Sequence, residues 1–133
     1  MKKIILAAFM AACGLQMSAQ QNLFVAQDLE SAIVNKDNTV TFNFKAPDAQ
    51  KVQIAGDFAE KAEGQHIGGM VGAGLIDMTK NSEGIWTYTT KPLDSELYSY
   101  EFMVDGVPTI DPNNVYVYRD FATTSNVFIV GNG

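Results

Sequence analysis

Cysteine, histidine and tryptophan are almost missing from this sequence. The 133 residues include one Cys, one His and one Trp. A disulfide within the chain needs two cysteines, and a structural zinc site needs about four Cys or His ligands. The composition therefore excludes a disulfide framework, and we expect no metal site and no cofactor.

Basic residues are also few. Nine Lys and Arg stand against fifteen Asp and Glu, which gives a formal net charge of -6. Nucleic acids and anionic membrane surfaces attract basic patches, and the only run of basic residues is Lys2-Lys3. We therefore expect no nucleic acid and no membrane surface as a partner, whereas neutral polymers and other proteins are compatible with this charge.

Long hydrophobic runs are absent as well. The apolar stretch Ile4–Ala12 ends well before the roughly 20 residues that a membrane-spanning helix needs. Two lysines before it and the small residue Ala19 after it are typical of a secretion signal. We expect residues 1–19 to be cleaved on export to the periplasm or the medium. The mature chain keeps seven basic residues against fifteen acids, so its net charge falls to -8.

Cys13 leaves a second route open. The run Met10-Ala11-Ala12-Cys13-Gly14 resembles a lipoprotein signal, in which the Cys is acylated and becomes the new N-terminus. Met10 stands where Leu is usual, which favours ordinary cleavage. Lipidation at Cys13 is the one membrane association that the sequence suggests.

Short alternations of apolar and polar residues dominate the rest of the chain. In residues 39–44 the side chains of Val40, Phe42 and Phe44 share one face, and Val52 and Ile54 do the same in the next segment. Further strands are expected at 75–78, 85–89, 97–104, 115–118 and 126–130. Turns rich in Gly, Pro, Asn and Asp separate them, so about seven or eight strands predict an all-β sandwich.

The length suits one domain. We expect residues 20–30 to be a lead-in, 31–131 to form the sandwich, and 132–133 to begin a linker. Residues 57–74 are crowded with glycine and predict a long loop. Asp105-Gly106 predicts a two-residue hairpin turn.

Five motifs follow one another along the chain: VQIAGDF at 52–58, GIW at 84–86, YSYEFMVDG at 98–106, DPNN at 111–114 and SNVFIV at 125–130. Their order resembles the early-set immunoglobulin-like domain of the family-48 carbohydrate-binding module type. That family includes glycogen-binding domains and the N-terminal modules of starch-branching and debranching enzymes. The sequence is more similar still to the N-terminal domains of secreted bacterial feruloyl and acetyl-xylan esterases. The resemblance covers about residues 30–131.

The resemblance implies a non-catalytic accessory module of a secreted carbohydrate esterase. Its expected partners are a xylan-like plant cell-wall polysaccharide and an attached or neighbouring esterase domain. Two alternatives stay open, a purely structural spacer and an α-glucan module that binds starch or glycogen. The α-glucan alternative is disfavoured because Ala59–Lys61 and Val107-Pro108 replace the family's stacking tryptophans, and Glu101 replaces its basic residue.

Candidate contacts with a glycan are aromatic rings that stack on sugars and an amide that binds hydroxyls. They are Phe58, Trp86, Tyr116, Tyr118 and Asn126. For Trp86 the competing interpretation, packing at the edge of the core, is favoured. The alternate residues Tyr98, Tyr100 and Phe102 are expected in the core, which leaves Glu101 facing solvent.

Nothing in the sequence predicts catalysis by this chain. His66 has no nucleophile beside it, and the G-x-S-x-G motif of hydrolases does not occur. The spacing of Asp57, Glu60 and Glu63 matches no calcium-binding loop. Arg119 and Asp120 are expected to form a local pair or to contact a neighbouring domain. We therefore predict that the domain is not an enzyme.

Overall fold

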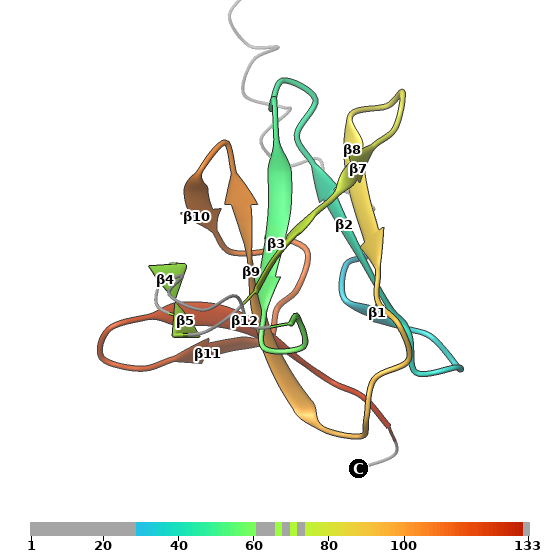
Figure 1. Ribbon diagram of the computed structural model, residues 1–133, viewed down its shortest axis with the longest axis vertical. Helices are drawn as coiled ribbons and strands as arrows, with labels where there is room; N and C mark the ends of the chain where they lie inside the picture. The colour runs from blue at the N-terminus through green and yellow to red at the C-terminus, as the bar shows by residue number, and fades with distance from the viewer. Residues whose placement is uncertain (1–28, 61–65, 68–69, 72–73, 132–133) are drawn as a thin grey trace, which may run out of the picture.

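The computed structural model describes residues 29–60, 66–67, 70–71 and 74–131. In these residues the chain forms twelve strands, and ten of them build an immunoglobulin-like β-sandwich of two facing sheets (Figure 1). Within the same ranges no helix has the length and apolar character needed to cross a membrane. The all-β sandwich predicted from the alternation is confirmed.

One sheet has four strands and the other has six. The four-stranded sheet has the order β1 (Ile33–Val34), β2 (Val40–Lys45), β8 (Ile85–Thr89) and β7 (Thr79–Lys80). The six-stranded sheet has the order β11 (Val117–Arg119), β12 (Thr124–Ile129), β9 (Leu97–Val104), β3 (Val52–Gly56) and β6 (Gly74–Asp77), and β10 (Val107–Thr109) pairs with the end of β9. A separate hairpin consists of β4 (His66–Ile67) and β5 (Met70–Val71).

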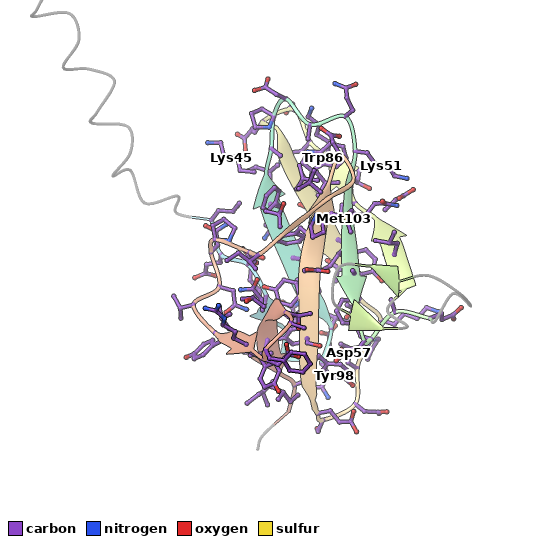
Figure 2. All side chains as sticks on the ribbon, turned by 90° about the vertical axis from the view of Figure 1, so that its left-hand side faces the viewer. Lys45, Lys51, Asp57, Trp86, Tyr98 and Met103 are labelled. Carbon is purple, nitrogen blue, oxygen red and sulfur yellow. The ribbon has the colours of Figure 1, made fainter. Side chains whose placement is uncertain are left out.

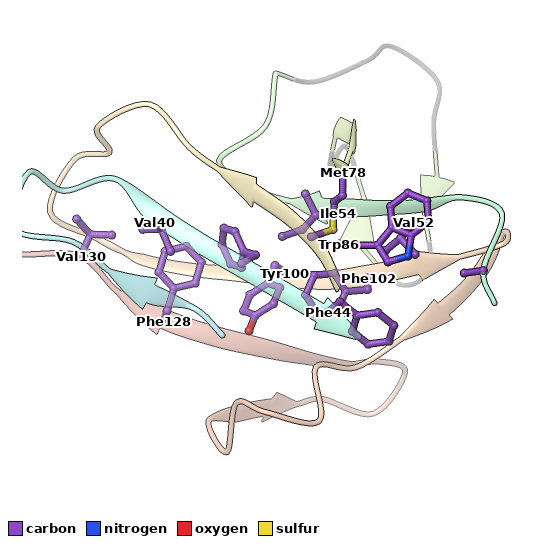
Figure 3. Packing of buried hydrophobic residues seen from close by; sticks show 12 residues of the cluster. Val40, Phe44, Val52, Ile54, Met78, Trp86, Tyr100, Phe102, Phe128 and Val130 are labelled. Carbon is purple, nitrogen blue, oxygen red and sulfur yellow. The ribbon is translucent and has the colours of Figure 1, made fainter. Parts of the chain in front are cut away.

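The core is an aromatic layer between the two sheets (Figure 3). From β2, Phe42 packs against Tyr100 of β9 and Phe128 of β12, with ring centroids 4.8 and 5.4 Å apart. Phe44 packs on Phe102 in the same way at 4.7 Å. Large aromatic side chains bury more apolar area than any others, so this layer supplies most of the sandwich's hydrophobic stabilisation.

The strand pattern of the sequence is largely confirmed, with additions that alternation does not reveal. β1, β4, β5 and β7 have two residues each, too few to show a period. Within the long loop predicted for residues 57–74, the structure adds the short strands β4 and β5 and the first residue of β6. The remaining loop residues, 61–65, 68–69 and 72–73, lie outside the described part of the chain.

The hairpin turn predicted at Asp105-Gly106 is confirmed. Val104 pairs with Val107 across it, and both turn residues have positive φ, 47° and 83°. Two positive φ values define the type I′ turn, whose twist matches that of paired strands. The Asp105 carboxylate also accepts hydrogen bonds from the N–H groups of Gln50 and Lys51, which ties this turn to the start of β3.

A buried polar network joins the 111–114 turn to the sheet. The Tyr100 hydroxyl donates to Asp111 Oδ2 at 2.7 Å, and Asn114 Nδ2 donates to the same hydroxyl oxygen at 3.0 Å. Asn126 accepts from the Asp111 N–H at 2.6 Å and donates to the Asn114 carbonyl at 3.0 Å. Burial and the nearby Asp111 carboxylate raise the pKa of Tyr100 far above its ordinary value, so the phenol stays a donor.

We predict that Tyr100→Phe lowers the free energy of unfolding by about 1–3 kcal/mol, because it leaves Asp111 Oδ2 buried without its donor. Tyr98→Phe is the matched control, since the Tyr98 hydroxyl donates only to the Asp94 carbonyl at an exposed site. Its expected loss is below about 1 kcal/mol. Urea unfolding of the two variants measures the difference, and equal losses would contradict the role assigned to the network.

Candidate functional site

Two of the five candidate residues are not at the surface. Trp86 is 7% exposed, and its Nε1 donates to the Ala46 carbonyl at 2.9 Å. Asn126 is fully buried, and its amide is taken up by the 111–114 turn. Neither can contact a sugar from outside. The expectation that Trp86 packs against the core is confirmed, and both residues are corrected to structural roles.

Phe58 is half-buried and belongs mainly to the core. Its ring stacks on Phe42 with centroids 5.4 Å and planes 12° apart. The rest of the ring lines a hollow of about 310 Å³ together with Tyr88, Leu93 and neighbouring residues. Most of the apolar area of Phe58 is therefore already buried in contacts within the protein, and only part of the ring is accessible to a ligand.

Tyr116 and Tyr118 are the two candidate residues that the surface displays. They are 70% and 58% exposed. The Tyr116 carbonyl accepts from the Val127 N–H at 3.0 Å, and Tyr118 pairs with Ser125, so both tyrosines lie beside β12. Residues two apart in a strand share a face, and the two rings therefore project from the same side of the six-stranded sheet.

That side is the outer face of the sheet, turned away from the core. Figure 2 views the six-stranded sheet from this side, with β9 and Met103 near the centre. Tyr118 pairs with Ser125 of β12, and Glu101 of β9 pairs with Ala55 of β3. Asn126 of β12 pairs with Tyr100 of β9, so the neighbouring residues Ser125 and Glu101 also lie opposite each other. Cross-strand neighbours share a face. Tyr118, Ser125, Glu101 and Ala55 consequently form one row across four strands.

Glu101 is buried, which corrects the expectation that it faces solvent. It is 5% exposed, and within the described residues its Oε1 has no hydrogen-bond partner. Burial raises the pKa of Glu101 above its usual range. The alternation of β9 assigns Glu101 to the outer face correctly. It does not reveal that the outer face is shielded from water here, beside the apolar cluster of Ala55, Met103 and Leu75.

A groove of about 460 Å³ lies next to Tyr116, which is part of its lining. It lies between β1 and β12, and its walls are mainly aliphatic. Its lining includes Val34, Leu97, Asn113, Val115, Tyr116 and Ile129. Asn113 Nδ2 is buried with no hydrogen-bond partner in the described part of the chain. Tyr116 is therefore shared between the outer face and this groove.

The acidic and basic residues considered earlier have other roles. The Asp57 carboxylate accepts from Ser99 N–H and Oγ at 2.9–3.2 Å, and Glu63 lies outside the described residues. In the described ranges no group of three His, Cys, Asp or Glu side chains is placed to hold a metal ion. The side chain of His66 lies outside the described residues, so its role stays a prediction.

Arg119 and Asp120 do not form the local ion pair that was one of the two expectations. Asp120 Oδ1 accepts from the N–H groups of Ala122 and Thr123 at 2.7 and 2.6 Å, and these bonds lower the pKa of Asp120. Over the described ranges the one ion pair joins Lys51 to Asp77 at 3.4 Å. Asp120 is thus a turn-forming residue.

The sequence matches no protein-family model and no curated protein. Solved structures with a similar fold include pullulanases. The Group B Streptococcus pullulanase SAP matches with a TM-score of 0.55 and 15% identity over 80% of this chain, and its complex with maltotetraose matches with 0.54 and 16% over 80%. Type I pullulanase from Bacillus subtilis str. 168, complexed with maltose, matches with 0.52 and 16% over 76%.

This chain spans only 15%, 15% and 13% of the lengths of those three structures. At such identities the similarity establishes the fold alone. It agrees with the immunoglobulin-like sandwich that the motif order implied. None of the three is an esterase, so the expected esterase context finds no support among them.

We predict that Glu101→Gln stabilises the protein near pH 7. The buried carboxyl has a raised pKa, so the folded state holds its proton to higher pH than the unfolded state does. Stability from this group is then complete below the unfolded-state pKa and is lost as the pH rises through the folded-state pKa. The variant should therefore exceed the wild type in unfolding free energy at pH 7 and match it at acid pH.

Glu83→Gln is the control, because Glu83 is exposed on the turn before β8. Denaturant unfolding across pH compares the three proteins. A Glu101→Gln variant that is less stable than the wild type at pH 7 would contradict the conclusion that burial of the Glu101 carboxylate destabilises the folded state.

Proposed function

We propose that this domain is a non-catalytic carbohydrate-binding module, that its ligand is an α-glucan, and that it meets the glucan on the outer face of the six-stranded sheet. The observation that carries the proposal is the pair of exposed aromatic rings with their phenol hydroxyls on this face, Tyr118 of β11 and Tyr116 just before it.

This combination suits a sugar. The apolar face of a pyranose ring packs on an aromatic side chain, while its hydroxyls need hydrogen-bond partners. Tyr116 and Tyr118 provide two such rings side by side at the sheet edge. The phenol hydroxyls of these exposed rings can donate to or accept from the hydroxyls of a sugar at the same surface.

The choice of an α-glucan is supported by the structural neighbours. They are pullulanases, and two were solved with maltotetraose or maltose. Tyr118 of β11 and Tyr116 just before it would take over the stacking that the family's tryptophans provide, since Ala59–Lys61 and Val107-Pro108 hold those positions here. A xylan-like polysaccharide, implied by the similarity to esterase modules, is the second ligand class to test.

The domain would act by proximity and not by chemistry. Binding of a polymer by one module raises the local substrate concentration for any catalytic domain attached to it. A glycan hydrolase, whether an esterase or an α-glucan hydrolase, is the partner class that this role requires. The signal sequence predicted at residues 1–19 would direct export to a compartment in which the protein can encounter such polymers.

Native affinity electrophoresis tests the ligand class. We expect the purified protein to be retarded in gels that contain starch or glycogen and not in gels that contain xylan or arabinoxylan. Retardation by the xylans alone would assign the ligand to the second class. Unchanged mobility in all four gels would overturn the proposal and favour a structural spacer.

We predict that Tyr118→Ala weakens binding to the retarding polymer by about tenfold, because stacking on one ring contributes roughly 1 kcal/mol or more. Tyr118→Phe is the matched control, since it keeps the ring and should keep most of the affinity. The apparent dissociation constant follows from mobility over a series of polymer concentrations. If the Ala and Phe variants both migrate like the wild type, Tyr118 is not a contact residue.

A further inference from the structure

β11 is an edge strand whose outer side carries free backbone groups. The Val127 N–H donates to the Tyr116 carbonyl, and the Asp120 N–H donates to the Thr123 carbonyl. Antiparallel pairing alternates along a strand, so residues 116, 118 and 120 turn their backbone groups toward β12. The N–H and C=O groups of Val117 and Arg119 therefore point out of the sheet, and no partner for them is found in the described part of the chain.

The side chains on both faces of this edge are exposed and mostly apolar. All three residues of β11 are exposed, and so are Val115 and Tyr116 before it, while Phe121 after it is fully exposed. Proteins usually protect a sheet edge with Lys, Pro or a bulge. Between residues 115 and 119 the one charge is Arg119, and no acid interrupts the stretch although the chain has fifteen.

We propose that this edge pairs with the same edge of a second copy, so that two β11 strands run antiparallel about a twofold axis at Val117. The two six-stranded sheets would then join into one. Such a contact is isologous, because each copy uses the same surface. It would give the outward N–H and C=O groups of Val117 and Arg119 hydrogen-bond partners in the other copy.

The chemistry of the edge favours this register. With the axis at Val117, the outward residue Arg119 lies opposite Val115 of the other copy, and Tyr118 lies opposite Tyr116. Aromatic pairs placed opposite each other stabilise antiparallel strands. An axis at Arg119 would instead place two guanidinium groups opposite each other, which is unfavourable.

The same register gives Phe121 a place. In this register Arg119 of one copy lies opposite Val115 of the other, and Phe121 follows two residues later. Phe121 therefore lies at the end of the strand pair where the groove between β1 and β12 opens. The groove has aliphatic walls that include Val34, Leu97 and Ile129, all exposed in the single chain. An exposed aromatic ring and an apolar groove thus occur on one chain on opposite sides of the proposed axis. This symmetry favours a second copy as the occupant.

Analytical ultracentrifugation of the purified protein over a concentration series tests the proposal. We expect the wild type to form dimers. Val117→Lys should be monomeric, because each copy would place an ammonium group opposite its counterpart at the axis. Val107→Lys is the matched control: Val107 is an exposed valine on β10, outside the proposed contact, and this variant should dimerise like the wild type. Circular dichroism verifies that both variants fold.

Phe121→Ala gives a second readout that does not touch the strand. The ring is fully exposed in the single chain, so its removal should leave the fold intact and weaken dimerisation by about tenfold or more. A wild type that stays monomeric at the highest concentration, or a Val117→Lys variant that dimerises like the wild type, would overturn the proposal. Both measurements are made without glycan, so their outcome is independent of the proposed function.

Discussion

Tyr100 is the side chain on which both halves of this structure depend. Its ring packs in the aromatic layer between the sheets, 4.8 Å from Phe42 and 5.7 Å from Phe102. Its hydroxyl extends past the core to Asp111 and Asn114. One residue therefore links hydrophobic packing to a buried hydrogen-bond network. A buried polar group that loses its partner costs more than the bond itself contributes, so the two functions of Tyr100 are hard to separate.

The network decides where the exposed tyrosines lie. Asn114 donates to the Val127 carbonyl and accepts from the Tyr116 N–H, so the end of the 111–114 turn is bonded to both β12 and the segment that leads into β11. Asn126 anchors the start of the same turn from β12. The backbone that carries Tyr116 and Tyr118 is therefore hydrogen-bonded to the buried network, although neither ring contributes to the core.

The outer face of the six-stranded sheet combines features that stability alone would not select. The buried carboxyl of Glu101, whose Oε1 has no hydrogen-bond partner in the described residues, is costly to bury, and a run of exposed Val and Tyr at a sheet edge invites association. Both are on surfaces that border β12, one on the outer face and one along the edge. Departures from the local rules of a stable fold are typical of functional sites, which is why the two proposals concentrate there.

Which residues form the sandwich can be predicted from the sequence alone. Alternation placed Val40, Phe42 and Phe44 on one face, and the Asp-Gly turn after β9 has the geometry that its residues require. These features depend on residues that are close together in the sequence, so they can be predicted without knowledge of the fold. The motif order also indicated the immunoglobulin-like arrangement of the strands.

Which side chains are exposed to solvent depends on how the strands pack together, and this cannot be derived from the sequence pattern. Trp86 and Asn126 are buried because strands distant in sequence close over them, and Glu101 is shielded although its strand turns it outward. Tyr116 and Tyr118 remain exposed because nothing in the described part of the chain packs over their rings. A strand's period states which face a residue is on, whereas exposure depends on what packs against that face.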